Sequence, residues 1–163
     1  SLGAGMPISA VTGRAEVMDA SHVGGVGGTY GGSPLSCVAA LEAVAEIRTP
    51  EFLEHAATTG RLLERRLDSW KERFELVGDV RGLGPMRLVE LVRDRVTKEP
   101  APDETLAIIR RAVAAGLILI RAGLYSNCIR LLPPLNAPES VIEEGLDVLE
   151  EAIAAQQPSR GTA

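Results

Sequence analysis

Glycine dominates residues 24–34, which read Gly-Gly-Val-Gly-Gly-Thr-Tyr-Gly-Gly-Ser-Pro. A segment of this composition has too little apolar surface to fold alone and needs a scaffold from other parts of the chain. Glycines also permit positive φ angles, so several N–H groups can point at one anion. Ser33 and Pro34 predict a helix start with Ser33 as N-cap, and a helix N-terminus favours negative charge. The loop is therefore either a plain connection or an anion site to which Thr29 adds a hydroxyl.

The composition predicts a folded protein without a nucleic-acid or membrane partner. The 163 residues are 45% hydrophobic and 24% charged, with a net charge of −5. An acidic chain has no electrostatic footprint for nucleic acid or for an anionic membrane. The longest apolar run, residues 112–120, is far too short to cross a bilayer. Cys37 and Cys128 stand in apolar surroundings, which predicts two buried thiols in a reduced cytoplasmic compartment.

Hydrophobic spacing predicts a small α+β unit in the second part of the chain. Thr49 and Asp103 are the expected N-caps of two of its helices, and Gly116 is an expected helix stop. A further helix, directly after Pro34, is apolar nearly all round and is expected to be largely buried. The predicted helices cover residues 34–47, 50–74, 103–115 and a last stretch that opens at Asn136 or Pro138; the predicted strands cover residues 8–11, 76–80, 87–92, 117–121 and 128–132.

Few side chains stand in a pattern that indicates chemistry. His22 and His55 have no Cys, Asp or Glu at ligand spacing, so no metal site is predicted. Arg130 is different, because it interrupts the apolar strand Cys-Ile-Arg-Leu-Leu, where a charge is costly unless it is paired or meets a ligand. It is either a structural or outward-facing residue or a carboxylate-binding one. For Arg81 and Glu90 a structural role is favoured.

Four carboxylates of the last predicted helix repeat on its polar side. They are most simply a solvated face. These residues are Glu143, Glu144, Glu150 and Glu151.

Several stretches together resemble the class III pyridoxal-phosphate aminotransferases. Residues 1–11 resemble the segment that directly follows the cofactor-binding lysine of that family, and residues 12–20 are similar to the 4-aminobutyrate aminotransferases in particular. Residues 27–34 resemble the family's Gly-Thr-(Tyr/Phe)-x-Gly-Asn-Pro loop. Residues 79–86 and 127–131 resemble two motifs of its C-terminal region.

The resemblance implies a fold and a domain organisation. The fold would be the C-terminal portion of the α/β pyridoxal-phosphate transferase fold type I. Residues 1–47 would complete the large cofactor-binding domain and form the linking helix. Residues 48–157 would form a small α+β domain with a mainly antiparallel sheet, and residues 158–163 a tail. The resemblance also implies a cytoplasmic homodimer whose subunits share their active sites.

The resemblance further implies two groups of site residues. Gly28 and Thr29 would contact the phosphate of pyridoxal 5'-phosphate, across the dimer interface in the neighbouring subunit's site. Arg130 would bind a carboxylate of the amino donor or of 2-oxoglutarate. Ser33 replaces the family's usual Asn, but both residue types can cap a helix.

The family's catalytic lysine would fall immediately before Ser1. Lys71 and Lys98 lie in charged, exposed sequence and cannot replace it. We therefore expect this chain alone to be inactive and to belong to a longer enzyme. Three explanations stay open for a sequence that begins just after the expected lysine: a real truncation, proteolysis, and a division of the chain at a modified lysine.

The resemblance implies a reaction for the parent enzyme. It would move the amino group of 4-aminobutyrate to 2-oxoglutarate, giving succinate semialdehyde and glutamate. Two alternatives stay open. One is another class III aminotransferase, acting on ornithine or acetylornithine, and the other is a non-catalytic fragment that serves only as an interaction module.

Overall fold

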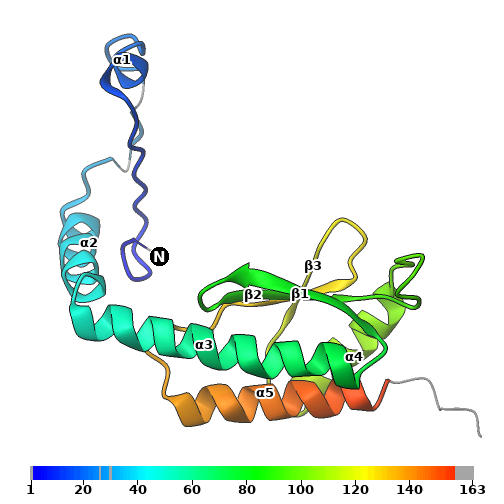
Figure 1. Ribbon diagram of the computed structural model, residues 1–163. Helices are drawn as coiled ribbons and strands as arrows, with labels where there is room; N and C mark the ends of the chain where they lie inside the picture. The colour runs from blue at the N-terminus through cyan, green and yellow to red at the C-terminus, as the bar shows by residue number, and fades with distance from the viewer. Residues whose placement is uncertain (1, 26, 30, 157–163) are drawn as a thin grey trace, which may run out of the picture. The chain divides into compact units, whose positions relative to one another are not determined.

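The computed structural model describes residues 2–25, 27–29 and 31–156 (Figure 1). Contacts between residues divide the chain into two units, Ser1–Leu53 and Glu54–Ala163, and each is described by itself below. The predicted boundary between a large and a small domain near residue 47 stays a prediction. The predicted tail, residues 158–163, lies outside the described residues.

The first unit holds two helices, α1 (Ala15–Met18) and α2 (Pro34–Ile47). The bounds of α2 are those that the sequence predicted. The strand predicted at residues 8–11 is wrong, because these residues are irregular. Ser33 occupies the N-cap position of α2, as predicted, although its side chain makes no capping hydrogen bond.

Helix α2 is not largely buried within this chain, contrary to the prediction. Leu35, Val38 and Leu41 are 72%, 60% and 70% exposed, and Ser36 is the one residue of the helix that is fully buried. The helix is apolar on most sides, and helix α1, the other helix of the first unit, buries none of its own residues. Helix α2 therefore presents an apolar stripe, with residues spaced three apart on one side of the helix.

Most of the second unit is built on the long helix α3 (Pro50–Arg73). The Thr49 hydroxyl accepts a hydrogen bond from the backbone N–H of Phe52 at 3.2 Å, which confirms Thr49 as the cap. Helix α4 (Pro102–Ala114) instead has Ala101 at its N-cap, so the prediction that Asp103 caps it is wrong. The fixed φ of Pro102 suits the first helical position, and Asp103 becomes part of the first turn. The last helix, α5 (Glu139–Ala154), begins just after Pro138.

Four antiparallel strands form one sheet in the order β1-β2-β4-β3. The antiparallel sheet was predicted, but β1 and β2 extend into the expected turn and leave only Gly84 and Pro85 between them. Strand β3 is shorter than predicted. The bounds are Val77–Leu83 for β1, Met86–Leu91 for β2, Ile120–Ala122 for β3 and Cys128–Leu131 for β4.

The helices α3, α4 and α5 cover one face of this sheet (Figure 1). Leu67 and Trp70 of α3 pack with Ile129 of β4 and Ile153 of α5, and all four are 0% exposed. Along each strand, alternate residues point into this core, as the period of two requires. The intervening residues form a second sheet face that none of the helices α3, α4 and α5 covers, called the open face below.

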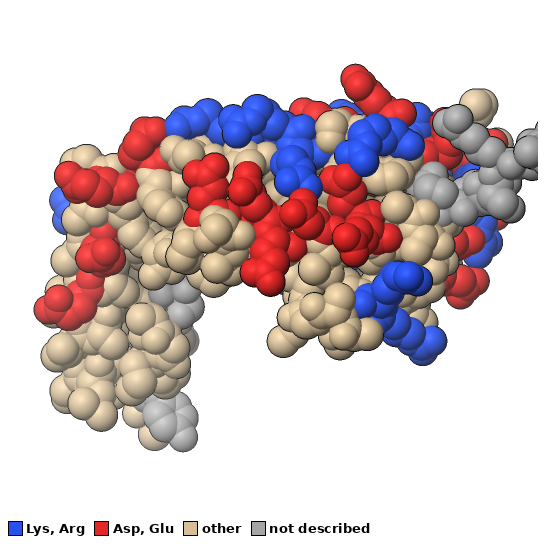
Figure 2. All heavy atoms as spheres, turned by 90° about the horizontal axis from the view of Figure 1, so that it is seen from below, with Lys and Arg blue, Asp and Glu red and all other residues tan. Residues whose placement is uncertain are grey.

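The prediction of a solvated acidic face on α5 is correct for Glu143, Glu144 and Glu151, which are exposed, and wrong for Glu150. The Glu150 side chain is only 18% exposed and accepts a hydrogen bond from the indole N–H of Trp70 at 2.7 Å. Acidic and basic side chains lie next to one another on the face in Figure 2.

The two cysteines are free and differ in exposure. Cys128 is buried, as predicted, whereas Cys37 is only half-buried.

Candidate functional site

A hollow of about 720 Å³ lies in the first unit, beside the glycine loop. Gly28 and Thr29 both line it, so the structure brings the two predicted phosphate contacts together. The N–H of Gly31 donates to the carbonyl of Gly28 at 2.9 Å, which closes a tight turn with Thr29 inside it. The described residues that line the hollow include no acidic side chain. These residues are Pro7, Ile8, Ser9, Gly25, Gly27, Gly28, Thr29, Gly31, Gly32, Ser33, Ser36 and Cys37.

The first turn of α2 borders the same hollow. The backbone N–H of Cys37 donates to the carbonyl of Ser33 at 2.9 Å, which is the first hydrogen bond of the helix. Pro34 has no N–H, and among the described residues the N–H groups of Leu35 and Ser36 donate to no backbone carbonyl. Free donors and the positive end of the helix dipole therefore meet at a concave surface, which is the chemistry of an anion site.

Ser36 was not singled out in the sequence, yet it is the most unusual residue of the hollow. Its side chain is 2% exposed, and its Oγ has no hydrogen-bond partner among the described residues. Buried hydroxyl groups nearly always have a partner. The signal that could have found it is a polar residue in the first turn of a helix that is otherwise apolar.

Arg130 lies in the second unit, on the open face of the sheet. The register places Arg81, Leu88, Arg130 and Ile120 in one row across β1, β2, β4 and β3. Arg130 therefore has an apolar cross-strand neighbour on each side, Leu88 and Ile120. Directly opposite residues have Cβ atoms about 5 Å apart.

Arg81 is the other basic residue of this row, and it is paired. Its guanidinium donates to Glu90 at 2.6 Å and to Asp79 at 2.8 Å. These hydrogen bonds, first that of Glu90 and then that of Asp79, raise the pKa of Arg81 above its usual value. The prediction of a structural role for Arg81 and Glu90 agrees with this ion pair.

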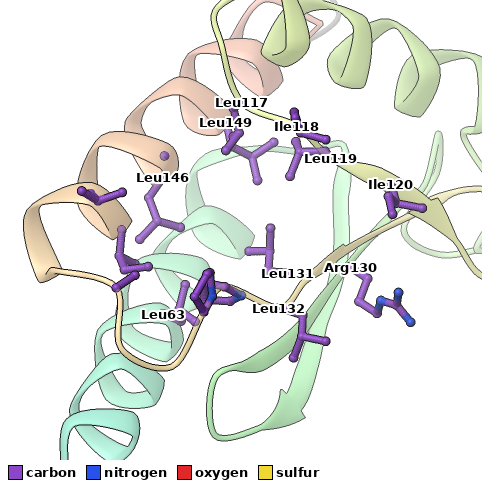
Figure 3. A pocket seen from close by; sticks show the side chains of 16 residues that line it. Leu63, Leu117, Ile118, Leu119, Ile120, Arg130, Leu131, Leu132, Leu146 and Leu149 are labelled. Atoms are coloured by element: carbon purple, nitrogen blue, oxygen red, sulfur yellow. The ribbon is translucent and has the colours of Figure 1, made fainter. Parts of the chain in front are cut away.

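Arg130, in contrast, has no hydrogen bond or ion pair with any described residue. Figure 3 shows its guanidinium directed away from the cluster that includes Leu131 and Leu146. The outward-facing interpretation of Arg130 therefore agrees with its exposure, and the described residues give no support to a structural ion pair. An exposed, unpaired guanidinium between two apolar neighbours offers a planar fork of donors to a carboxylate.

An apolar groove of about 490 Å³ opens beside the strand that carries Arg130 (Figure 3). Leucine, isoleucine, valine and proline side chains of α5, of the segment 117–120 and of residues 131–134 form most of its wall. Among the described residues that line it, Arg130 is the one that carries a charge.

Other kinds of site find no support in the described part of the chain. It contains no group of three or more His, Cys, Asp or Glu residues that could hold a metal ion. None of its helices combines the length and the apolar character that a membrane span requires. Lys98 is exposed and Lys71 pairs with Asp68 at 3.0 Å, so neither resembles a buried catalytic lysine.

Comparison with known proteins identifies the family. The sequence profile described as aminotransferase class III matches residues 1–153. The chain therefore belongs to the class III aminotransferases.

Three relatives of known name differ in the activity for which they are named. A 4-aminobutyrate aminotransferase of Mycobacterium tuberculosis is 46% identical over 145 residues, which cover 89% of this chain and 32% of the relative. A 5-aminovalerate aminotransferase of Pseudomonas aeruginosa is 42% identical over 151 residues, which cover 93% of this chain and 35% of that protein. A leucine/methionine racemase of Thermococcus litoralis is 45% identical over 159 residues, or 98% of this chain and 35% of the racemase. The chain thus spans about a third of the length of these relatives.

Solved structures show the same fold. An aminotransferase of Bacillus anthracis superposes with a TM-score of 0.72 at 33% identity, over 78% of this chain and 29% of that one. An amine transaminase from an uncultivated Pseudomonas species, in its PLP-bound form, superposes with a TM-score of 0.71 at 32% identity, over 79% of this chain and 29% of that one. The small antiparallel sheet with its helices is therefore part of the pyridoxal-phosphate transaminase fold.

Proposed function

We propose that the chain is the C-terminal part of an aminotransferase that uses pyridoxal 5'-phosphate and moves the amino group of 4-aminobutyrate to 2-oxoglutarate. The products are succinate semialdehyde and glutamate. The observation that carries the proposal is the unpaired guanidinium of Arg130, which lies on the open face of the sheet between two apolar neighbours. Family membership and relatives named 4-aminobutyrate aminotransferase support the choice of reaction.

The hollow of the first unit fits the phosphate of this cofactor. It offers the hydroxyl of Thr29, the backbone at Gly28, the free N–H groups of α2 and an unpartnered buried hydroxyl, without an acidic side chain in its described lining. When bound, pyridoxal phosphate supplies the carbonyl electrophile and the electron sink of amino-group transfer. In our proposal Gly28 and Thr29 hold its phosphate in the neighbouring subunit of a cytoplasmic homodimer.

Arg130 then fixes the position of the substrate. Its fork of donors binds one carboxylate in a bidentate manner, while Leu88 and Ile120 face the carbon chain and limit the access of water. Arg81 does not compete for the substrate, because Glu90 and Asp79 already neutralise it. One arginine of the row is therefore free for the substrate and the other stabilises the sheet.

The domain assignment and the inactivity of the isolated chain belong to the same proposal. Residues 1–47 would complete the large domain and residues 48–157 would form the small one. Because neither lysine of the chain is suited to catalysis, we expect the 163-residue chain alone to transfer no amino group. Only the longer enzyme would do so.

The test is a substitution of Arg130 in the full-length enzyme. Loss of a bidentate, charge-assisted pair costs about 3 kcal/mol, so R130A should raise the KM for 2-oxoglutarate about 100-fold. R121A is the matched control, since Arg121 is an exposed arginine of the neighbouring strand, beside Ile129 and not in the row of Arg130. I120E places a carboxylate directly opposite Arg130 and should also raise this KM, although the arginine is unchanged.

Equal KM values for R130A and R121A would refute the role of Arg130. The choice of amino donor needs a separate comparison. The full-length enzyme should use 4-aminobutyrate with a higher kcat/KM than 5-aminovalerate, ornithine and acetylornithine, and another order would assign a different class III activity. A colourless full-length protein that takes up no cofactor would instead favour a non-catalytic interaction module, for which the exposed apolar stripe of α2 is the available surface.

A further inference from the structure

Ser36 combines three properties that are seldom found together. It lies in the first turn of the 14-residue helix α2, it lines the hollow beside Thr29, and its hydroxyl is buried without a partner in the described part of the chain. A buried hydroxyl without a hydrogen bond costs free energy. A bound ion or ligand is one explanation for a buried polar group that has no partner.

We infer that Ser36 is an additional phosphate-binding residue, whose hydroxyl donates to the anion that Gly28 and Thr29 hold. This inference rests on the proposed function and adds a residue to its cofactor site. Rotation about χ1 carries a serine Oγ among three staggered positions, so a phosphate in the hollow can engage it without movement of the backbone. The hydroxyl, the free N–H of Ser36 and the helix dipole then act on the same charge.

The hollow itself selects an anion rather than a cation. Its described lining contains no carboxylate, and it includes the hydroxyl-bearing residues Thr29, Ser33 and Ser36. Cys37, the next residue along the helix, already donates its N–H to Ser33, so it cannot take the place of Ser36. A phosphate, with several acceptor oxygens, can accept from the loop and from the helix at once.

The experiment measures cofactor binding by the full-length apoenzyme, with pyridoxal 5'-phosphate and with pyridoxal, which lacks the phosphate. S36A should weaken the binding of pyridoxal phosphate about tenfold, the value of one hydrogen bond to a charged acceptor, and leave pyridoxal binding unchanged. S21A is the control, because Ser21 is an exposed serine of the same unit outside the lining of the hollow. It should change neither affinity.

Thermal unfolding supplies the second measurement. Removing an unpartnered hydroxyl should not lower the melting temperature of the apoenzyme. The rise in melting temperature on addition of pyridoxal phosphate should be smaller in S36A than in wild type, because that rise depends on affinity. A fall in apoenzyme stability with an unchanged rise would overturn the inference and make Ser36 structural.

T29A separates the two levels of the proposal. If T29A weakens the binding of pyridoxal phosphate and S36A does not, the inference about Ser36 is wrong and the proposed phosphate site stands. If neither variant changes the affinity, the proposed phosphate site fails together with the inference. An equal loss of affinity for pyridoxal and pyridoxal phosphate in S36A would also overturn the inference about Ser36, since Ser36 would then not bind the phosphate group.

Discussion

The Glu150 carboxylate of α5 interacts with three side chains of α3 through hydrogen bonds and ion pairs. Replacing Glu150 should show which of these interactions stabilises the fold. One carboxylate oxygen accepts from the Trp70 indole N–H at 2.7 Å and from Arg66 at 3.1 Å. The other pairs with Arg73 at 2.6 Å. Arg66 has a second partner, Asp147, at 2.6 Å.

The magnitude follows from what each partner loses in E150A. Trp70 is 0% exposed, so its indole N–H would be buried without an acceptor, at a cost of about 1–3 kcal/mol. The Arg73 and Arg66 side chains are 53% and 29% exposed, and pairs this accessible contribute at most about 1 kcal/mol. We therefore expect E150A to lower the free energy of unfolding by about 2–3 kcal/mol. In E150Q the amide oxygen still accepts from Trp70, so the loss should be less than half as large.

Urea unfolding, monitored by tryptophan fluorescence, measures the difference in unfolding free energy between E150A and E150Q. Trp70 is the single tryptophan of the chain, so the signal reports on this site. E151A is the control, because Glu151 is the neighbouring exposed carboxylate and its loss should change stability by less than about 0.5 kcal/mol. An E150A variant as stable as E151A would refute the reasoning. Equal losses in E150A and E150Q would also refute it, because the charge and not the indole acceptor would then be decisive.

The same carboxylate predicts a dependence on pH. Burial alone would raise the pKa of Glu150, but the hydrogen bonds from Trp70, Arg73 and Arg66 outweigh it and lower the pKa below its ordinary value. In the unfolded chain the pKa of a glutamate side chain is about 4.3. The stabilisation is therefore fully present above that pH and is lost as the pH falls through the lower, folded pKa. The stability difference between wild type and E150Q should shrink over this acidic range.

Two further predictions concern a thiol and a turn. Burial, with a smaller effect of the Glu90 carboxylate, raises the pKa of the Cys128 thiol, so Cys128 should resist a thiol reagent at neutral pH until the chain unfolds. The half-buried Cys37 should react first, in a fast phase. The C37S variant should lack this fast phase. At Gly82, where φ is +147°, an alanine Cβ would stand 2.1 Å from the Met86 carbonyl oxygen, so G82A should lower the free energy of unfolding by about 2 kcal/mol or more in urea titrations. G84A, with φ +53° and open space around it, should cost only about 1 kcal/mol, and an equal loss in both variants would contradict the steric argument.

Much of the fold follows from spacing along the sequence. Apolar residues at intervals of four and three placed Leu63, Leu67 and Trp70 on one face of α3, and all three are buried. Strand ends were harder to predict, because β1 continues through Arg81 and Gly82 on the strength of its pairing with β2. That pairing depends on a partner strand rather than on local propensity.

The candidate site was predictable in its residue types and only partly in its contacts. A charged residue in an apolar strand singled out Arg130, but only the register shows that its neighbours are Leu88 and Ile120 and not a carboxylate. The interpretation of Glu150 as a solvated residue failed for the same reason, since its partner Trp70 lies 80 positions away. Local periodicity cannot report a hydrogen bond between side chains on two separate helices.

The contrast between Arg81 and Arg130 shows how one sheet face carries a paired arginine beside the arginine that we propose for substrate binding. Both side chains stand in the same row, yet Arg81 reaches Glu90 and Asp79, which belong to the adjacent row that also holds Cys128 and Ala122. The residues of the adjacent row that lie on β4 and β3, near Arg130, are Cys128 and Ala122. A thiol and a methyl group cannot neutralise a guanidinium. A slip of one residue in register would turn Arg130 toward the core, where an unpaired charge is costly. The pairing of β4 with β2 and β3 therefore does more than hold the sheet together, because it keeps one arginine both exposed and unpaired.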